Sequence, residues 1–369
     1  MRVAFISSLN GGVGTYTVEL VKALSDSVNK IDLYLFTSDP AKKRPDFPKN
    51  VNIIAYTNSP LKLMISLFKH FKKLRCVNLI HLNYASFFVP VYLSKKFWGT
   101  PYILTSHGLP QPNMEKGFMK VYYFLEKNLL KMTSKCSAQH IAISGFVQKN
   151  FMSEYGLESS VVYHGIQRES RLNISDTKRQ NVRKKLNIPL DQFVVLYVGN
   201  MNRYKNVMTL INAIPVVLSS KKDTTFIIIG KGELQEAAKQ KVTDLNITDQ
   251  VIFISYAKDL MSYYVAADLF VLPSINEMFG IVLLEAMSYG LPVVASRGGA
   301  CPEVLGDAGL LFDPQNHQEL AANILSLLGE KGIYRELQKR SLERVKQFTW
   351  DKAAKCYFSI YMKYGRNCK

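Results

Sequence analysis

The chain has 369 residues, more than one hydrophobic core usually supports, so we expect two domains. Its 47% hydrophobic and 21% charged residues are typical of a soluble globular protein. Five scattered cysteines without a Cys-x-x-Cys pair argue against a zinc site or a disulfide framework and favour a reducing cytosol. Pro90 interrupts the longest apolar candidate, Ala85–Leu93, so no membrane-spanning segment is expected.

In the first half, short apolar strands alternate with helical segments, beginning with a run too short for a signal-peptide core. The predicted strands are Val3–Ser7, Ile31–Thr37, Val51–Tyr56, Leu79–Leu82, Tyr102–Ser106, Ile141–Ser144 and Val161–Tyr163. The predicted helices are Tyr16–Leu24, 61–75 and Val121–Leu130. This alternation predicts a mostly parallel sheet covered on both faces.

A charged segment without a long apolar run, 168–191, is the predicted linker, and a second alternating set follows it. Its strands are Phe193–Val198, Phe226–Ile229, Val251–Ile254, Leu269–Leu272 and Pro292–Ala295. Its helices are 207–219, 233–244, 258–266 and 281–289, with a mainly helical tail from about 317. We therefore predict two doubly wound α/β halves facing a cleft, with ligand at the carboxyl ends of the strands.

The pattern Glu277-x-Phe279-Gly280-x4-Glu285 places one carboxylate in a loop and a second inside the apolar helix 281–289. A helix N-terminus has unpaired N–H groups and a positive dipole end, which favour a phosphate. Glu285 lies about 7.5 Å along that helix at 1.5 Å per residue. The pattern predicts a nucleotide-sugar site, with a diphosphate between two carboxylates that accept hydrogen bonds from hydroxyls.

Glycines follow the first strand of each half. Gly12 would let the backbone approach a phosphate, although the loop lacks the third glycine of the dinucleotide fingerprint and a simple tight turn is the alternative. Gly199 is followed by Arg203 and Lys205. These cations would stabilise a leaving diphosphate without a metal, unless they are only solvated loop residues.

His107 follows the strand Tyr102–Ser106, so its imidazole is expected to point into the cleft. There it would bond a sugar hydroxyl or position the anomeric carbon, although a lone histidine is more often structural. His164 occupies another plausible edge of the cleft, with less support. Glu303, after Gly298-Gly299, belongs either to an active-site turn or to a simple helix N-terminal charge.

In this order, these motifs resemble those of the retaining GT-B glycosyltransferases of glycosyltransferase family 4. The resemblance is densest over 193–351 and thinner over 1–167. It implies two Rossmann-like domains around a central cleft, the first (1–167) for the acceptor and the second (168–347) for the nucleotide sugar. A C-terminal helix within 348–369 is expected to cross back onto the first domain.

The resemblance also implies residue roles. Glu277 would contact the donor sugar and Glu285 the ribose hydroxyls, while Lys205 would hold the diphosphate and His107 would lie beside the transferred sugar. His107, Glu277 and Lys205 are thus the expected catalytic residues. The expected donor-binding residues are Gly12, Gly199, Arg203, Lys205, Glu277, Phe279, Gly280 and Glu285.

Enzymes of this kind retain the anomeric configuration and usually need no bound metal, in agreement with the lack of an Asp-x-Asp motif in the sequence. Two positions depart from the family pattern. Asn200 replaces an arginine that many relatives carry directly after Gly199, and Arg203 is the candidate to supply that charge. His164-Gly165 stands where Asn-Gly is usual.

Residues 60–135 hold 12 basic and two acidic side chains, and 61–75 combines a helical apolar stripe (Leu61, Met64, Ile65, Phe68) with flanking lysines. Such a helix can lie on an anionic membrane surface. The alternative is an ordinary helix packed on the sheet with a solvated lysine face. Membrane contact would imply a lipid-linked acceptor and peripheral attachment on the cytoplasmic face.

Three other functions remain as alternatives. A nucleotide-sugar epimerase would need no acceptor, and a phosphorylase would need a pyridoxal phosphate lysine that we do not identify. A basic nucleic-acid-binding protein would show aromatic-rich motifs that are lacking here. We therefore predict transfer of a hexosyl residue from a UDP- or GDP-sugar to a glycan or lipid-linked acceptor in cell-surface polysaccharide or glycolipid synthesis. No cofactor, metal or nucleic acid is expected to take part.

Overall fold

The structure is a computed structural model that describes residues 1–37, 44–108, 118–166, 175–257 and 259–367. The chain folds into two compact units. Unit 1 comprises Met1–Gln167 and Trp350–Lys369, and unit 2 comprises Arg168–Thr349. Each unit is built around its own sheet, and in both sheets the paired strands run parallel.

Unit 1 has a seven-stranded sheet in the order β3-β2-β1-β4-β5-β6-β7. Its strands are β1 (Arg2–Ser8), β2 (Lys30–Phe36), β3 (Val51–Thr57), β4 (Leu79–Leu82), β5 (Tyr102–Ser106), β6 (Gln139–Ala142) and β7 (Ser160–Val161). Its helices are α1 (Gly11–Leu24), α2 (Pro60–Lys69), α3 (Phe88–Trp98), α4 (Phe118–Cys136), α5 (Gly145–Tyr155) and α14 (Trp350–Tyr364).

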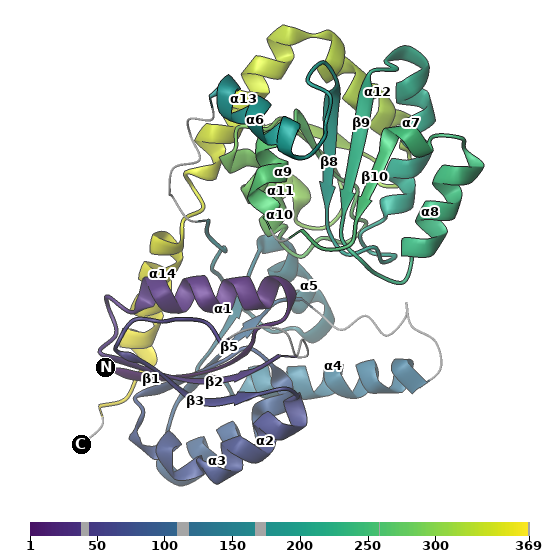
Figure 1. Cartoon of the computed structure of the whole chain (residues 1–369). Coiled ribbons are helices and arrows are strands. Elements are labelled where there is room, and N and C mark those ends of the chain that lie inside the picture. The colour runs from purple at the N-terminus through teal and green to yellow at the C-terminus, as the bar shows by residue number, and fades with distance from the viewer. Residues whose placement is uncertain (38–43, 109–117, 167–174, 258, 368–369) are drawn as a thin grey trace. The chain divides into compact units, whose positions relative to one another are not determined.

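Alternation along β1 explains how this sheet is covered on both faces. Val3 and Phe5 belong to a core shared with α1 and α14, whereas Ala4 and Ile6 belong to a core shared with α2, α3 and α4. Figure 1 shows α1 and α14 side by side on one face, with α2 and α3 on the other. The last helix therefore contributes to the core of unit 1, as its buried Tyr357 and Tyr361 indicate.

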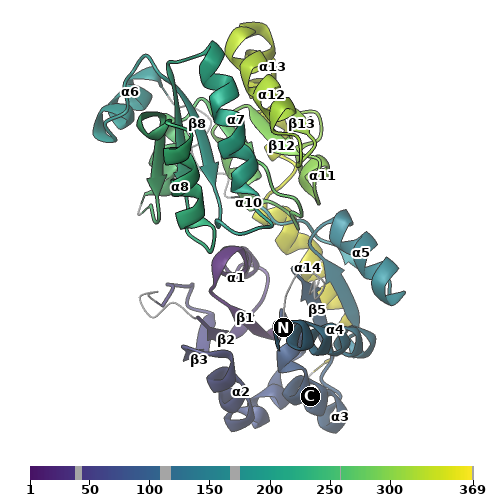
Figure 2. The same cartoon turned by 90° about the vertical axis from the view of Figure 1, so that its right-hand side faces the viewer.

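Unit 2 has a six-stranded sheet in the order β10-β9-β8-β11-β12-β13. Its strands are β8 (Phe193–Val198), β9 (Thr224–Ile229), β10 (Val251–Ile254), β11 (Leu269–Leu272), β12 (Val293–Ser296) and β13 (Gly309–Phe312). Its helices are α6 (Asp176–Lys185), α7 (Val207–Ser220), α8 (Gln235–Asp244), α9 (Leu260–Ala266), α10 (Ile281–Ser288), α11 (Cys301–Leu305), α12 (His317–Gly329) and α13 (Lys331–Val345). Figure 2 shows α7, α8 and α12 in unit 2 from a second side.

The predicted parallel α/β architecture is confirmed, and the predicted strands recur within a few residues of their expected ends. The predicted start of the first helix, Tyr16, was wrong. Gly11–Gly14 form the first turn of α1 and do not form a loop. No helix was predicted for the segments that form α3 and α5.

The predicted linker 168–191 was wrong where it overlaps α6; residues 168–174 lie outside the described residues. Arg183 of α6 is buried and donates to the Ala266 and Gln192 carbonyl oxygens, and its guanidinium also pairs with Asp268. A charged segment can therefore pack when one arginine satisfies several buried acceptors.

Within the described residues, no helix is long and apolar enough to cross a bilayer.

Candidate functional site

In unit 2 the strand order reverses between β8 and β11, which brings together the loops that follow β8, β11 and β12. Parallel sheets bind ligands at such a switch point, beyond the carboxyl ends of the strands. Lys205 follows β8, Glu277 follows β11, and Gly298-Gly299 follows β12. The three motifs from the sequence thus meet at one edge of one sheet.

Lys205 and Glu277 form an ion pair, with 2.6 Å between Nζ and Oε2. The Ser274 hydroxyl also donates to Oε2, over 3.1 Å. The Glu277 side chain is only 8% exposed and that of Lys205 27% exposed. Among the described residues both contacts fall on Oε2, so Oε1 can accept a hydrogen bond from a ligand hydroxyl.

The two loops that carry this pair are joined through their backbones. The Ile275 N–H donates to the Tyr204 carbonyl over 2.8 Å. Asn206, in the left-handed region at φ 54°, donates from Nδ2 to the Pro273 carbonyl over 3.0 Å. The Lys205 backbone N–H donates to Asn202 Oδ1 over 3.0 Å. The ammonium and the carboxylate are therefore presented by rigid, mutually bonded loops, as preorganised electrostatic stabilisation requires.

The glycine pair after β12 allows a very close backbone approach to the Glu277 loop. A Cβ at Gly298 would lie 2.3 Å from the Ile275 carbonyl oxygen. One at Gly299, where φ is +63°, would lie 2.1 Å from the Glu277 carbonyl oxygen. The Ala300 N–H donates to that same oxygen over 2.7 Å. Any side chain at these two positions would displace the loop that holds the carboxylate.

The helix α10 begins directly after this loop. Gly280 is its N-cap residue, with φ 87°. The Phe279 ring is buried, with its centroid 6.1 Å from that of the Phe348 ring, so Phe279 can face a ligand only through its backbone. The first N–H groups of such a helix lack helical partners and attract anions. Further along α10, Glu285 Oε2 accepts from the Tyr264 hydroxyl over 2.7 Å. That hydroxyl fixes the orientation of the second carboxylate.

The loop after β8 is shaped by a second glycine contact. A Cβ at Gly230 would lie 1.9 Å from the Gly199 carbonyl oxygen, so the two loops approach closely. Asn200 and Arg203 are both exposed. The Arg203 guanidinium is thus accessible to an anion, whereas Lys205 is engaged with Glu277.

In unit 1, His107 follows β5 and bonds to Asn83, which follows the neighbouring strand β4, over 2.9 Å. Burial lowers the pKa of His107 to about 3. The imidazole is therefore neutral at pH 7, and because the Asn83 oxygen accepts, Nε2 carries the proton. Nδ1 is left as a lone-pair acceptor, buried and without a partner among the described residues.

Gly12 is exposed in the first turn of α1, so its backbone lies at a helix N-terminus as a phosphate site requires. Gly14 is needed for packing, because a Cβ there would lie 2.3 Å from the Leu9 carbonyl oxygen. His164 is buried between aromatic rings, 4.9 Å from the Tyr16 ring and 5.9 Å from the Trp350 ring. His164, which stands where the family usually has asparagine, therefore contributes its side chain to the core of unit 1.

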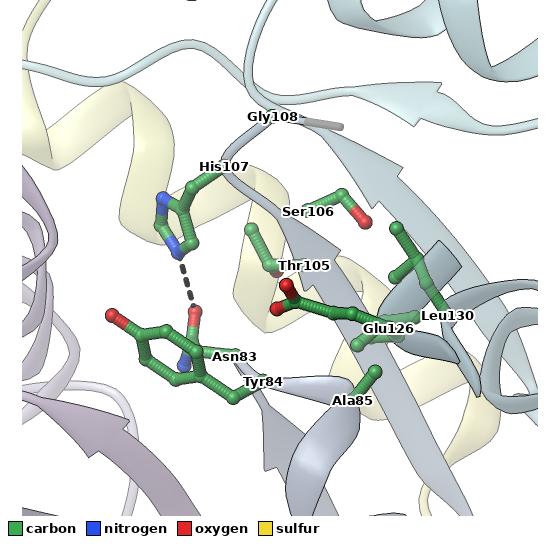
Figure 3. A pocket seen from close by; sticks show the side chains of 10 residues that line it. Asn83, Tyr84, Ala85, Thr105, Ser106, His107, Gly108, Glu126 and Leu130 are labelled. Atoms are coloured by element: carbon green, nitrogen blue, oxygen red, sulfur yellow. Dashed lines mark hydrogen bonds between the residues drawn. The ribbon is translucent and has the colours of Figure 1, made fainter. Parts of the chain in front are cut away.

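A pocket of about 230 Å³ opens beside His107 and includes Asn83, Tyr84, Leu104, Glu126 and Leu130 (Figure 3). Of these residues, only His107 was predicted from the sequence to belong to a site. Asn83 and Tyr84 directly follow a predicted strand, so the reasoning applied to His107 could have found them. Glu126 lies inside α4, and no local pattern distinguishes it from other charged helix residues.

Comparison with known families matches both halves of the chain. Residues 10–170 match Glycosyltransferase Family 4, and residues 178–346 match Glycosyl transferases group 1.

Individual relatives agree with this result. The chain is 32% identical to the putative teichuronic acid biosynthesis glycosyltransferase TuaC of Bacillus subtilis, over 61% of this chain and 54% of that protein. It is 35% identical to the O-antigen chain mannosyltransferase B of Escherichia coli, over 43% of each chain. The chain thus spans about half the length of these relatives.

The structure of Anabaena HepE, solved with UDP-glucose, superposes with a TM-score of 0.79 at 20% identity, covering 98% of this chain and 99% of that one. Two parallel sheets, the motifs at their carboxyl edges and both family matches show that the chain belongs to glycosyltransferase family 4 (glycosyl transferases group 1) and has the GT-B fold.

Proposed function

We propose that the protein transfers a hexosyl residue from a UDP- or GDP-sugar to a glycan or lipid-linked acceptor with retention of anomeric configuration. The observation that carries this proposal is the Lys205–Glu277 pair beside the N-terminus of α10. One edge of unit 2 thereby offers a cation and helix N–H groups for a diphosphate, and carboxylates for hydroxyls. The relatives TuaC and O-antigen mannosyltransferase B support a role in cell-surface polysaccharide synthesis.

The chemistry needs charge stabilisation above all. When the bond between the anomeric carbon and the phosphate oxygen breaks, the nucleoside diphosphate leaves with the electron pair. Lys205, the backbone at Gly280 and the exposed Arg203 would stabilise that charge, with no metal required. Glu277 Oε1 would hold a hydroxyl of the transferred sugar, and Glu285 would accept from the ribose.

His107 is not suited to act as a general base. A general base works best when its pKa lies near the working pH, and a pKa of about 3 makes His107 a poor base at pH 7. Its Nδ1 lone pair can instead accept a hydrogen bond from a sugar hydroxyl. We therefore assign His107 a role in orienting the transferred sugar.

The donor nucleotide can be identified by calorimetric unfolding with UDP, GDP, ADP and their common sugars. One nucleotide family should stabilise unit 2, by about 2.7 kcal/mol at 100 times its dissociation constant. Calorimetry is preferable to intrinsic fluorescence, because both tryptophans, Trp98 and Trp350, belong to unit 1.

Two variants test which cation of unit 2 binds the nucleotide. Lys205→Met should abolish most of the stabilisation and Arg203→Gln should reduce it less, because Lys205 belongs to the ordered pair. A flat response of the unmodified protein to every nucleotide would contradict the donor assignment. Conversion of the donor alone, followed by NMR, would favour an epimerase instead.

Contact with an anionic membrane is the second part of the proposal, and it rests on α2. The helix packs on the sheet through Leu63 and Leu67. Its apolar stripe faces away from the core, with Leu61 71% exposed, Ile65 61% and Phe68 47%. An ordinary sheet-covering helix would bury such a stripe, so the exposed stripe favours the membrane alternative.

The side chains around the stripe carry positive charge, which is complementary to an anionic membrane surface. Lys62, Lys69 and Lys72 are exposed beside it. The neighbouring helix α3, which lies next to α2 in Figures 1 and 2, adds the exposed Val89 and Phe97. Each basic residue near an anionic surface contributes about 1 kcal/mol, less at high salt.

Flotation with vesicles tests this surface. Vesicles rich in phosphatidylglycerol should bind the protein at low salt, and pure phosphatidylcholine vesicles should bind it at least about tenfold less, because three lysines act together. Leu61→Ser with Ile65→Ser should lower binding strongly, whereas Tyr256→Ser with Met261→Ser, two exposed apolar residues of unit 2, should not. Equal binding to both vesicle types would refute membrane contact.

A further inference from the structure

Glu126 is an unusual residue in its part of the chain. It is one of two acidic residues among 12 basic ones between residues 60 and 135. Its carboxylate nevertheless makes no ion pair or hydrogen bond with the residues that the structure describes. The adjacent Lys127 instead pairs with Glu154 of α5.

The Glu126 side chain lines the pocket beside His107. Figure 3 shows it extending from α4 toward the side of the pocket that carries Asn83, Tyr84 and His107. Burial raises the pKa of this carboxyl group above its usual value. A carboxylate held in a pocket without a cation carries a desolvation cost that a ligand able to donate hydrogen bonds would offset.

Among the described residues of the pocket, His107 Nδ1 is still available as an acceptor, whereas Asn83, Thr105 and Ser106 are already engaged. Asn83 Oδ1 accepts from His107, and the Ser106 hydroxyl bonds to His140 over 2.8 Å. The Thr105 hydroxyl bonds to His81 over 2.8 Å. Glu126 is therefore the side chain best placed to bind a polar ligand, against walls that include the Tyr84 ring, Leu104 and Leu130.

We propose that this pocket binds a neutral, polyhydroxylated ring of the acceptor, and that Glu126 selects it by accepting hydrogen bonds from adjacent hydroxyls. A sugar ring matches the pocket because it presents hydroxyls at its edge and C–H groups on its faces. A carboxylate with two oxygens can accept from two neighbouring hydroxyls at once.

The same charge excludes another class of acceptor. Among the described residues that line the pocket, none is a lysine or arginine. A phosphate or carboxylate on this part of the acceptor would meet Glu126 without a compensating cation, and like charges at close range repel strongly in a partly buried site. Glu126 is thus a specificity-determining residue, and the inference rests on the proposed transferase function.

Ligand-observed NMR on the intact protein tests the proposal without knowledge of the acceptor. The neutral probes are methyl α-D-glucopyranoside, methyl α-D-mannopyranoside and N-acetylglucosamine; the charged probes are glucose 6-phosphate and mannose 6-phosphate. We expect saturation transfer at millimolar concentration to at least one neutral probe and to neither phosphate.

Two variants complete the design. Glu126→Gln keeps the shape of the side chain and should weaken neutral-probe binding about tenfold, since hydrogen bonds to an ionised acceptor are the stronger ones. Glu154→Gln makes the same charge change on the exposed partner of Lys127 and should leave binding unchanged.

Three results would overturn the proposal: no neutral probe binds, both classes bind equally, or Glu126→Gln binds as the unmodified protein does. Nucleotide binding to unit 2, measured on the same samples, separates this failure from a failure of the proposed function. If UDP or GDP still stabilises unit 2 while Glu126→Gln has no effect on probe binding, only the assignment of Glu126 is wrong.

Discussion

Replacing Glu277 by Gln should lower kcat/KM by about 10²- to 10³-fold, the range seen when one preorganised electrostatic group is removed from an active site. Glutamine can keep the hydrogen bond from Ser274 but cannot neutralise Lys205, whose ammonium lies 2.6 Å from Oε2. The expected loss is therefore in transition-state stabilisation and not in the fold. Initial rates with the donor identified by calorimetry measure it.

Matched variants separate this effect from a general loss of charge. Glu236→Gln removes the same charge from an exposed Lys239–Glu236 pair of α8 and should leave kcat/KM unchanged. Lys205→Ala and Glu285→Ala should each cost at least tenfold, because each removes one charged contact worth about 1.4 kcal/mol or more. Wild-type rates in two of the three variants Glu277→Gln, Lys205→Ala and Glu285→Ala would refute the donor-site assignment.

Unit 1 should unfold in mild acid, before unit 2. Burial lowers the pKa of His107 and His140 to about 3, and it also lowers those of His81 and His164. In the unfolded chain histidine titrates near pH 6.5, so between about pH 6.5 and 3 the unfolded state binds more protons. The stability contributed by these groups is complete above pH 6.5 and is lost as the pH falls.

The expected slope of stability against pH is large. Each histidine contributes up to about 1.4 kcal/mol per pH unit, so four together contribute up to about 5.5 kcal/mol per pH unit. Domains are stable by only about 5–15 kcal/mol, which places unfolding of unit 1 near pH 4 to 5. Urea titrations at several pH values, followed by tryptophan fluorescence, report on unit 1 alone because Trp98 and Trp350 both belong to it.

His140→Gln provides the internal test of this mechanism. The glutamine amide reaches the position of His140 Nε2, which contacts the Ser106 hydroxyl over 2.8 Å, but it does not titrate. The slope of stability against pH should therefore fall by about 1.4 kcal/mol per pH unit, one histidine's share. An unchanged slope would mean that other groups, such as carboxylates, control the acid lability of unit 1.

Much of the candidate site in unit 2 could be located from the sequence, because its residues come from short, contiguous motifs. Glu277, Phe279, Gly280 and Glu285 lie within nine consecutive positions of one loop and one helix. Lys205 lies in the loop that follows β8, a strand made of apolar and aromatic residues. Local spacing is enough in such cases, since strand ends and helix starts fix where the side chains lie.

The contact between these motifs could not be predicted from the sequence. Two separate roles were expected for Lys205 and Glu277, whereas the structure joins them in one ion pair across 72 positions of the chain. Ser274 and Tyr264 act on the two carboxylates through contacts that no spacing rule reveals. Glu126 gives no signal in a helix whose other charges are ordinary, and its importance follows only from the pocket that surrounds it.

The sequence by itself determined the parallel α/β class and the positions of most strands, and it located the candidate donor motif, because these depend on apolar periodicity and on glycine and carboxylate spacing. Only the tertiary structure decided which face of α2 is buried, that a charged segment folds as α6, and that His107 is neutral. These three outcomes depend on what each side chain meets across the fold. Burial, desolvation and long-range hydrogen bonding are properties of the packed molecule, and neighbouring positions in the chain do not encode them individually.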